Sequence, residues 1–171
     1  MNDELSKVLA AREKRWETRL SIVRTTKRSL ITITLCLPVA FRTQEQYGQL
    51  FEQLCNQFRN RLFEEGIQTE FEGMLSGDDG FAFLLTTETE AGELKKHCVK
   101  AEEQITGGRM LDIDVMDAQG NPIGRSDIGL PPRLCFLCDH PAAICVAGKR
   151  HSKDEIADFA LSLIDRVINK D

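Results

Sequence analysis

The chain has 171 residues, of which 42% are hydrophobic and 29% are charged, and its net charge is −5. This composition is typical of one soluble folded domain, and the negative charge argues against general affinity for nucleic acid or membranes. The first fifteen residues are strongly charged and show no signal-peptide pattern. We therefore expect a cytoplasmic protein whose six cysteines are thiols or metal ligands.

Residues 3–28 are predicted to form a helix, because apolar side chains recur there at helical spacing. Within this helix, Arg12, Lys14 and Arg15 lie in little more than one turn. Such a run of cations is typical of a solvated helix face, but it also suits an anion-binding edge, and both interpretations remain open. The apolar positions of the helix are Leu5, Leu9, Trp16, Leu20 and Val23.

Residues 29–117 are predicted to form the core, an α+β fold of the split βαβ or ferredoxin-like type. Its helices should cover one face of the sheet, and its last strand should lie beside its first. Polymerase palms use the same layout to present metal-binding carboxylates, although fold analogy alone does not define a function. The expected elements are strand 29–37, helix 43–65, strands 67–75 and 80–86, helix 89–104 and strand 108–115.

The last of these strands carries two carboxylates on one face. Asp112 and Asp114 alternate with apolar residues, so their side chains point the same way, about 7 Å apart. Two adjacent like charges repel, and a divalent cation such as Mg²⁺ or Mn²⁺ between them would remove that cost. The alternative is a strand whose outer face is simply acidic. A second acidic pair, Asp78 and Asp79, lies in a glycine-flanked turn and is interpreted as turn-forming.

Residues 118–151 are predicted to form a loop rich in cysteine and arginine, followed by a helix over 152–169 that begins with a capping box from Ser152 to Glu155. Four loop residues can close a tetrahedral zinc site, although the later spacing departs from the usual zinc-finger patterns. Free thiols are the alternative. The four residues are Cys135, Cys138, Cys145 and His151.

Basic residues crowd the same region. A divalent metal with converging arginines and lysines suits a polyphosphate substrate, whereas pairing with surface acids would need no ligand. These residues are Arg125, Arg133, Lys149, Arg150 and His151.

An ordered series of motifs resembles the citrate lyase holo-acyl-carrier-protein synthase family, also called the apo-citrate lyase phosphoribosyl-dephospho-CoA transferase family. The series covers nearly the whole chain and departs from the family pattern at Val39-Ala40 and at Ala147-Gly148. The matching motifs are Ala11-Arg12-Glu13-x-Arg15, Gly108-Arg109-x-x-Asp112-x-Asp114-Val115, Arg125, Arg133-x-Cys135-x-x-Cys138, Cys145 and Arg150-His151-Ser152.

The resemblance implies a nucleotidyltransferase. A serine hydroxyl of the acyl carrier (gamma) subunit of citrate lyase would attack the α-phosphate of 2′-(5″-triphosphoribosyl)-3′-dephospho-CoA, and diphosphate would leave. Asp112 and Asp114 would be the catalytic Mg²⁺ ligands. His151 would be either an acid or a zinc ligand. The residues implied in triphosphate binding are Arg109, Arg125, Arg133, Arg150, Arg12 and Arg15.

Two other functions remain open from the sequence. A related transferase could modify a different carrier, as in the malonate decarboxylase system, and it would need the same metal. A non-enzymatic interaction module stapled by zinc would instead bind zinc and be indifferent to Mg²⁺. The departures at Val39-Ala40 and Ala147-Gly148 keep the first of these alternatives open.

Overall fold

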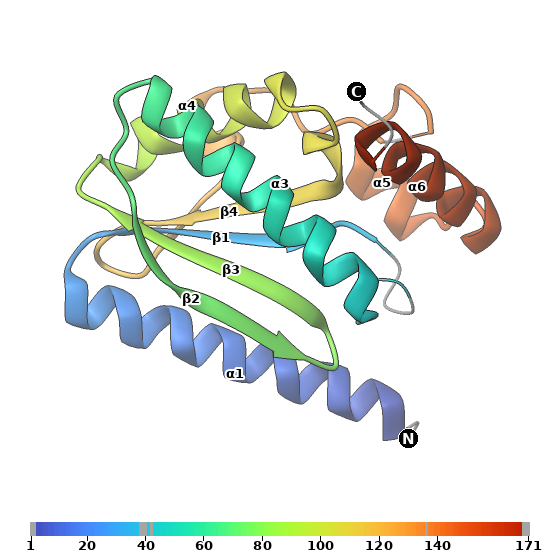
Figure 1. The fold of residues 1–171 in the computed structure, drawn as a ribbon, viewed down its shortest axis with the longest axis horizontal. Coiled ribbons are helices and arrows are strands. Elements are labelled where there is room, and N and C mark those ends of the chain that lie inside the picture. Colours follow the sequence, from blue (N-terminus) through green and yellow to red (C-terminus); the bar gives the residue numbers. More distant parts are fainter. Residues whose placement is uncertain (1–2, 38–40, 42, 136, 169–171) are drawn as a thin grey trace.

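The computed structural model describes residues 3–37, 41, 43–135 and 137–168. Over these residues the protein is an α+β fold with a five-stranded antiparallel sheet of order β2-β3-β1-β4-β5 (Figure 1). The strands are β1 Ser29–Leu35, β2 Glu70–Gly77, β3 Gly80–Thr87, β4 Leu111–Met116 and β5 Pro122–Ile123. The helices are α1 Asp3–Thr26, α3 Glu45–Glu64, α4 Ala91–Gln104, α5 Ala142–Ala147 and α6 Lys153–Ile168, with 3₁₀ turns at Gly108–Met110 and Ser126–Ile128.

The main core lies between the sheet and the helices α3 and α4, which cover the same face (Figure 1). Strand β1 lies between β3 and β4, so the prediction that the last core strand pairs with the first is confirmed. The alternation along β4 is also as predicted. Leu111, Ile113 and Val115 are buried in this core, while Asp112 and Asp114 point to the opposite face and are exposed.

Helix α1 covers much of that opposite face (Figure 1). A smaller core forms there, where Val23 of α1 meets Leu30, Leu84 and Met116 of the sheet. The predicted helix is confirmed, but it ends at Thr26 rather than 28. The next residue, Lys27, has a left-handed backbone (φ 57°), a conformation that stops a helix.

The apolar stripe assigned to this helix was only partly right. Leu5, Leu9 and Trp16 are exposed, whereas Val8 and Arg19 are buried with Val23. The face of the helix that lies against the strands is therefore mixed, and its Arg19 forms an ion pair with Asp114 of the sheet.

A close approach between α4 and β4 depends on glycine. Gly107 has a left-handed backbone (φ 80°), and a Cβ on Gly108 would overlap the carbonyl oxygen of Glu102 in α4. Because that oxygen belongs to helix backbone, the clash cannot be relieved by turning a side chain. The helix ends at Gln104 as predicted, but the strand expected from residue 108 begins only at Leu111, because a 3₁₀ turn occupies Gly108–Met110.

Gly108→Ala is expected to lower the free energy of unfolding by about 3 kcal/mol, because it forces backbone apart in a packed region. Urea denaturation measures this loss. Gly124→Ala is the control, since a Cβ there would make only ordinary contacts with Asp127 and Ser126. Equal stability of the two variants would contradict the assigned role of Gly108.

An ionic cluster joins α3 to α4. Glu65, just after α3, is hydrogen-bonded to His97 (2.7 Å) and forms an ion pair with Lys100 (2.9 Å), both in α4. These contacts hold the pKa of Glu65 below its usual value. Because the pKa is lowered in the folded state, the resulting stability is present above the unfolded pKa and is lost as the pH falls through the folded pKa.

We therefore expect the free energy of unfolding of the wild type to fall more steeply with decreasing pH than that of Glu65→Gln. The difference should appear below about pH 4.3, which is the ordinary pKa of a glutamate. Chemical denaturation at a series of pH values measures both slopes. Parallel slopes would show that the cluster adds no pH-dependent stability.

The segment predicted as a loop over 118–151 includes β5, which pairs with β4, close to the short extended piece that the sequence indicates through Ile123 to Arg125. Its later residues contain more structure than expected, namely a bridge between Leu134 and Pro141 and then helix α5. A six-residue helix is too short for its apolar pattern to be recognised in the sequence. The capping box is confirmed, since Ser152 and Glu155 bond reciprocally to each other's backbone N–H.

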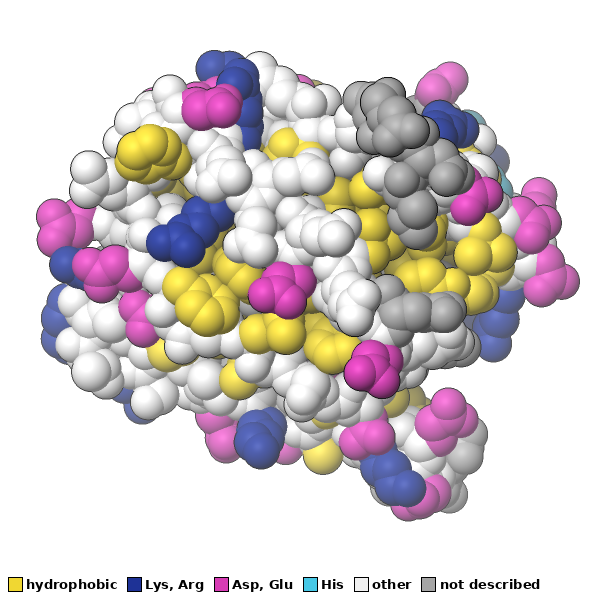
Figure 2. Space-filling view, in the orientation of Figure 1, with side chains coloured by type: hydrophobic (Ala, Val, Ile, Leu, Met, Phe, Trp, Pro, Cys, Tyr) yellow, Lys and Arg dark blue, Asp and Glu magenta, His cyan; other side chains and the backbone are white. Residues whose placement is uncertain are grey.

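Some predictions from the sequence lie outside the described residues, namely the departure at Val39-Ala40 and residue 169 of the last helix. The described helices include none that is both long and apolar enough to cross a bilayer. None of the six cysteines is in a disulfide. Figure 2 shows hydrophobic side chains over the outer strands, where Phe71 and Met74 of β2 are exposed, and on the side of the molecule that carries α5 and α6.

Candidate active site

The two carboxylates of β4 stand side by side on the face that α1 partly covers. In the register with β1, Asp114 lies opposite Thr32 and Asp112 opposite Thr34. The aspartate side chains are 57% and 58% exposed, whereas Thr32 is buried. Solvent therefore reaches both carboxylates, and small hydroxyl-bearing residues from β1 leave room beside them.

Each aspartate faces an arginine. Nη1 of Arg19, in α1, lies 3.3 Å from Oδ2 of Asp114, and Nη1 of Arg133 lies 3.7 Å from Oδ1 of Asp112. Burial lowers the pKa of the Arg19 guanidinium, and Asp114 acts in the opposite direction. Arg19 was missed in the sequence, although it lies one helical turn after Arg15 and so on the same face of the helix.

Two arginines predicted to bind triphosphate also connect the cysteine-rich segment to β4. Nη2 of Arg109 donates to the carbonyl oxygens of Leu134 (2.9 Å) and Cys135 (3.2 Å). In the other direction, Nη2 of Arg133 donates to the carbonyl oxygens of Arg109 (2.6 Å) and Leu111 (3.0 Å). This reciprocal pair of contacts brings Arg133 to the acidic strand.

The other predicted arginines lie in different places. Arg125 pairs with the buried Glu102 of α4, whose other oxygen pairs with Arg133. Arg12 and Arg150 are exposed. Arg15 points toward the β2–β3 turn, where it meets Asp79 at 2.6 Å. The acidic strand thus has Arg133 and Arg19 as its direct neighbours, with Arg125 held close to Arg133.

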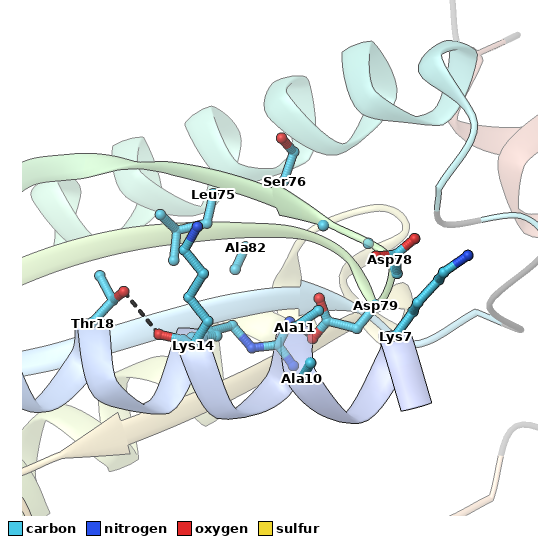
Figure 3. Close-up of a pocket in the computed structure, with 13 residues that line it drawn as sticks. Lys7, Ala10, Ala11, Lys14, Thr18, Leu75, Ser76, Asp78, Asp79 and Ala82 are labelled. Atoms are coloured by element: carbon cyan, nitrogen blue, oxygen red, sulfur yellow. Dashed lines mark hydrogen bonds and ion pairs between the residues drawn. The ribbon is translucent and has the colours of Figure 1, made fainter. Parts of the chain in front are cut away.

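A cavity of about 330 Å³ lies between α1 and the β2–β3 hairpin (Figure 3). Small residues such as Ala11 and Ala82 leave this space, and Lys7 and Lys14 extend along it. Asp79 does lie in the predicted turn, but it is buried and bound by Arg15 rather than simply forming the turn.

The cysteine and histidine residues of the later segment do come together. Their four ligand atoms, from Cys135, Cys138, Cys145 and His151, all lie within 4.8 Å of one another. Sγ of Cys138 lies 3.5 Å from Sγ of Cys145 and 3.4 Å from Nε2 of His151. Ligands of a tetrahedral ion with bonds of about 2.0–2.3 Å are spaced in this way. The cluster can therefore hold a metal ion such as zinc.

The surroundings of these thiols differ. Burial acts to raise the pKa of Cys135, but backbone N–H groups of Leu137 and Cys138 donate to its sulfur, and the net effect lowers the pKa. Burial and the neighbouring cysteines raise the pKa of Cys145 to about 11. A turn that directs N–H groups at sulfur stabilises a thiolate, which is the form that binds metal.

The fold and site together define an α+β protein in which an acidic strand, bordered by arginines, is joined to a Cys₃His cluster able to hold a metal ion. The family model of the apo-citrate lyase phosphoribosyl-dephospho-CoA transferases matches residues 3–167, and the chain belongs to this family.

Curated relatives agree with this family assignment over almost the whole chain. A probable apo-citrate lyase phosphoribosyl-dephospho-CoA transferase of Streptococcus pyogenes serotype M18 is 27% identical, covering 98% of this chain and 88% of the relative. The apo-citrate lyase phosphoribosyl-dephospho-CoA transferase of Escherichia coli O1:K1 is 26% identical, covering 95% and 89%. The protein of that name from Shigella flexneri serotype 5b is 28% identical, covering 81% and 75%.

Proposed function

We propose that this protein transfers the 2′-(5″-phosphoribosyl)-3′-dephospho-CoA group from its triphosphoribosyl precursor to a serine of the apo acyl carrier (gamma) subunit of citrate lyase, with release of diphosphate. Family membership supports the reaction class and the acceptor. The structural observation that supports it most directly is the exposed pair Asp112 and Asp114, each beside an arginine.

Asp112 and Asp114 would hold Mg²⁺, or Mn²⁺, through carboxylate oxygens, which are the ligands these hard cations prefer. When bound, the metal would supply a positive charge that stabilises the negative charge developing on the leaving diphosphate. The fit is good because both side chains are more than half exposed and share one face of β4.

The arginines then have distinct tasks. Arg133, already beside Asp112, is placed to bind the triphosphate, and Arg125 lies next to it through Glu102. Arg19 sets the orientation of Asp114 from the α1 side. Arg109 holds the cysteine-rich segment in place through the carbonyl oxygens of that segment. Arg12, Arg15 and Arg150 remain candidates for contacts with outer parts of the donor.

The Cys₃His cluster is proposed to bind one structural Zn²⁺. All four protein ligands are present, so no position remains open for a catalytic water. The ion would fix the turn at Cys135 against α5 and His151, and through Arg109 and Arg133 it would fix the edge of the acidic strand. His151 is therefore assigned to the metal rather than to acid catalysis.

We further propose that the core is ferredoxin-like, with the acidic pair placed as in a polymerase palm, and that the protein acts in the cytoplasm. The order of elements and the position of β1 between β3 and β4 support the first point. The second is supported by the six cysteines, none of which is in a disulfide.

Release of diphosphate, measured by a coupled enzyme assay, tests the reaction. It should require the donor, the apo carrier and Mg²⁺ together. Diphosphate released at the same rate without carrier would indicate hydrolysis rather than transfer. If diphosphate is released with the carrier of a malonate decarboxylase but not with that of citrate lyase, the assigned acceptor is wrong and the assigned reaction class still holds.

A further inference from the structure

Glu102, near the end of α4, carries an almost completely buried carboxylate, with 6% of the residue exposed. Its Oε1 lies 3.0 Å from Nη2 of Arg133, and its Oε2 lies 3.4 Å from Nη2 of Arg125. Burying a carboxylate is costly unless it is paired. Here one carboxylate binds two arginines from separate turns of the segment that follows β5.

Four cations act on this carboxylate. Arg133, Arg125, Lys95 and Arg109 all favour its charged form, although burial still raises the pKa of Glu102. Lys95 is buried and donates to the carbonyl oxygen of Ile113 in β4 (2.6 Å). Without a central negative charge these cations would repel one another in a poorly solvated space. This edge of β4 is therefore locally cationic in a chain whose net charge is −5.

Arg133 is held from two sides, by partners of different kinds. Nη1 faces Asp112, while Nη2 bonds to Glu102 and to the backbone of β4. Once Asp112 binds a metal, Nη1 is available to a phosphate oxygen, and the contacts of Nη2 keep the guanidinium in place. An arginine recognises phosphate well only when the plane of its guanidinium group is fixed.

We propose that Glu102 is a positioning residue that holds Arg133 and Arg125 at the edge of β4, so that they bind the triphosphate of the donor while Asp112 binds metal. This inference rests on the proposed function. It predicts that loss of the Glu102 charge weakens triphosphate binding rather than slowing the turnover of bound donor.

The test compares Glu102→Gln, which keeps the shape and loses the charge, with Glu102→Asp, which keeps the charge. Glu103→Gln is the matched control, because Glu103 is the next residue of the same helix and is exposed. Calorimetric titration with inorganic tripolyphosphate and Mg²⁺ gives Kd, and steady-state assays give kcat and KM for the donor. Thermal unfolding reports whether each variant is folded.

For Glu102→Gln we expect Kd for tripolyphosphate and KM for the donor to rise about tenfold, as when a charge-assisted contact is lost. The kcat should change by less than about threefold, because mainly uniform binding is removed. Glu102→Asp should recover part of the affinity, and Glu103→Gln should match the wild type.

The inference is overturned if folded Glu102→Gln has an unchanged Kd, or if Glu103→Gln loses as much affinity for tripolyphosphate. It is also overturned if only kcat falls, or if the wild type does not bind tripolyphosphate. If Glu102→Gln does not fold, Glu102→Asp is the deciding variant. A rise in its Kd for tripolyphosphate of less than about tenfold supports the positioning role, and an unchanged Kd overturns it. A wild type that binds tripolyphosphate in a Glu102-dependent way but transfers nothing would refute the proposed function and leave the positioning role standing.

Discussion

Asp112→Asn is expected to lower the rate of transfer to the carrier by about a thousandfold, the effect of losing a few kcal/mol of charge stabilisation in the transition state. The amide keeps the shape of the side chain but is a poor ligand for Mg²⁺. Because the carboxylate is 58% exposed, the fold should tolerate the change. The rate is measured at saturating donor over a range of Mg²⁺ concentrations, with circular dichroism as the check on folding.

The control for this variant is Asp78→Asn, which changes an exposed aspartate in the β2–β3 turn. It should keep nearly the full rate, because the turn lies outside the proposed metal site. If Asp112→Asn retains the wild-type rate and Mg²⁺ dependence, the acidic strand is a solvated face and the metal assignment fails.

Cys138→Ser is expected to abolish zinc binding and to lower Tm by about 10 °C, because a structural zinc site contributes directly to folding. Cys138 is the informative position, since its sulfur is close to both Cys145 and His151. Zinc content by mass spectrometry should fall from about one ion per chain to nearly none. Hydrogen exchange should accelerate in residues 133–151 more than in the sheet.

Cys36→Ser provides the comparison, because Cys36 is a partly exposed cysteine outside the cluster. It should retain zinc and the wild-type exchange pattern. The zinc assignment fails if the purified wild-type protein contains no zinc and Cys138→Ser has the same hydrogen-exchange rates as the wild type. The four residues would then be neighbouring side chains without a metal.

The acidic strand could be predicted from the sequence because the required information is local. Alternation of Asp112 and Asp114 with apolar residues determines which face each side chain occupies, whatever the rest of the chain does. The neighbouring strand also followed from the order of elements, and the structure pairs β4 with β1. The capping box at Ser152 was predictable for the same reason, since both partners lie within one helical turn.

The partners of these carboxylates could not be predicted, because they are distant in sequence. Arg19 is 95 residues from Asp114, and its burial depends on how α1 lies across the sheet. In the sequence, nothing distinguishes Glu102 from other helix glutamates, because the two arginines that bind it belong to a later segment. Arg109 and Arg133 were recognised by their motif, but the motif did not indicate that their guanidinium groups bond to backbone carbonyls.

The cysteine cluster could be predicted only in part. Cys135 and Cys138 form a recognisable pair, whereas the places of Cys145 and His151 depend on α5 and the turn that follows it. The exposed Leu5, Leu9 and Trp16 show the limit of helical periodicity, since that pattern identifies a helix without fixing which face is buried.

The proposed transfer is tested by the intact mass of the apo carrier after incubation with this protein, the triphosphoribosyl-dephospho-CoA donor and Mg²⁺. We expect a gain equal to one phosphoribosyl-dephospho-CoA group, located on a serine, and no gain when EDTA is present. An unmodified carrier, in the presence of folded, zinc-replete enzyme and a donor of verified mass, would contradict the proposed transfer.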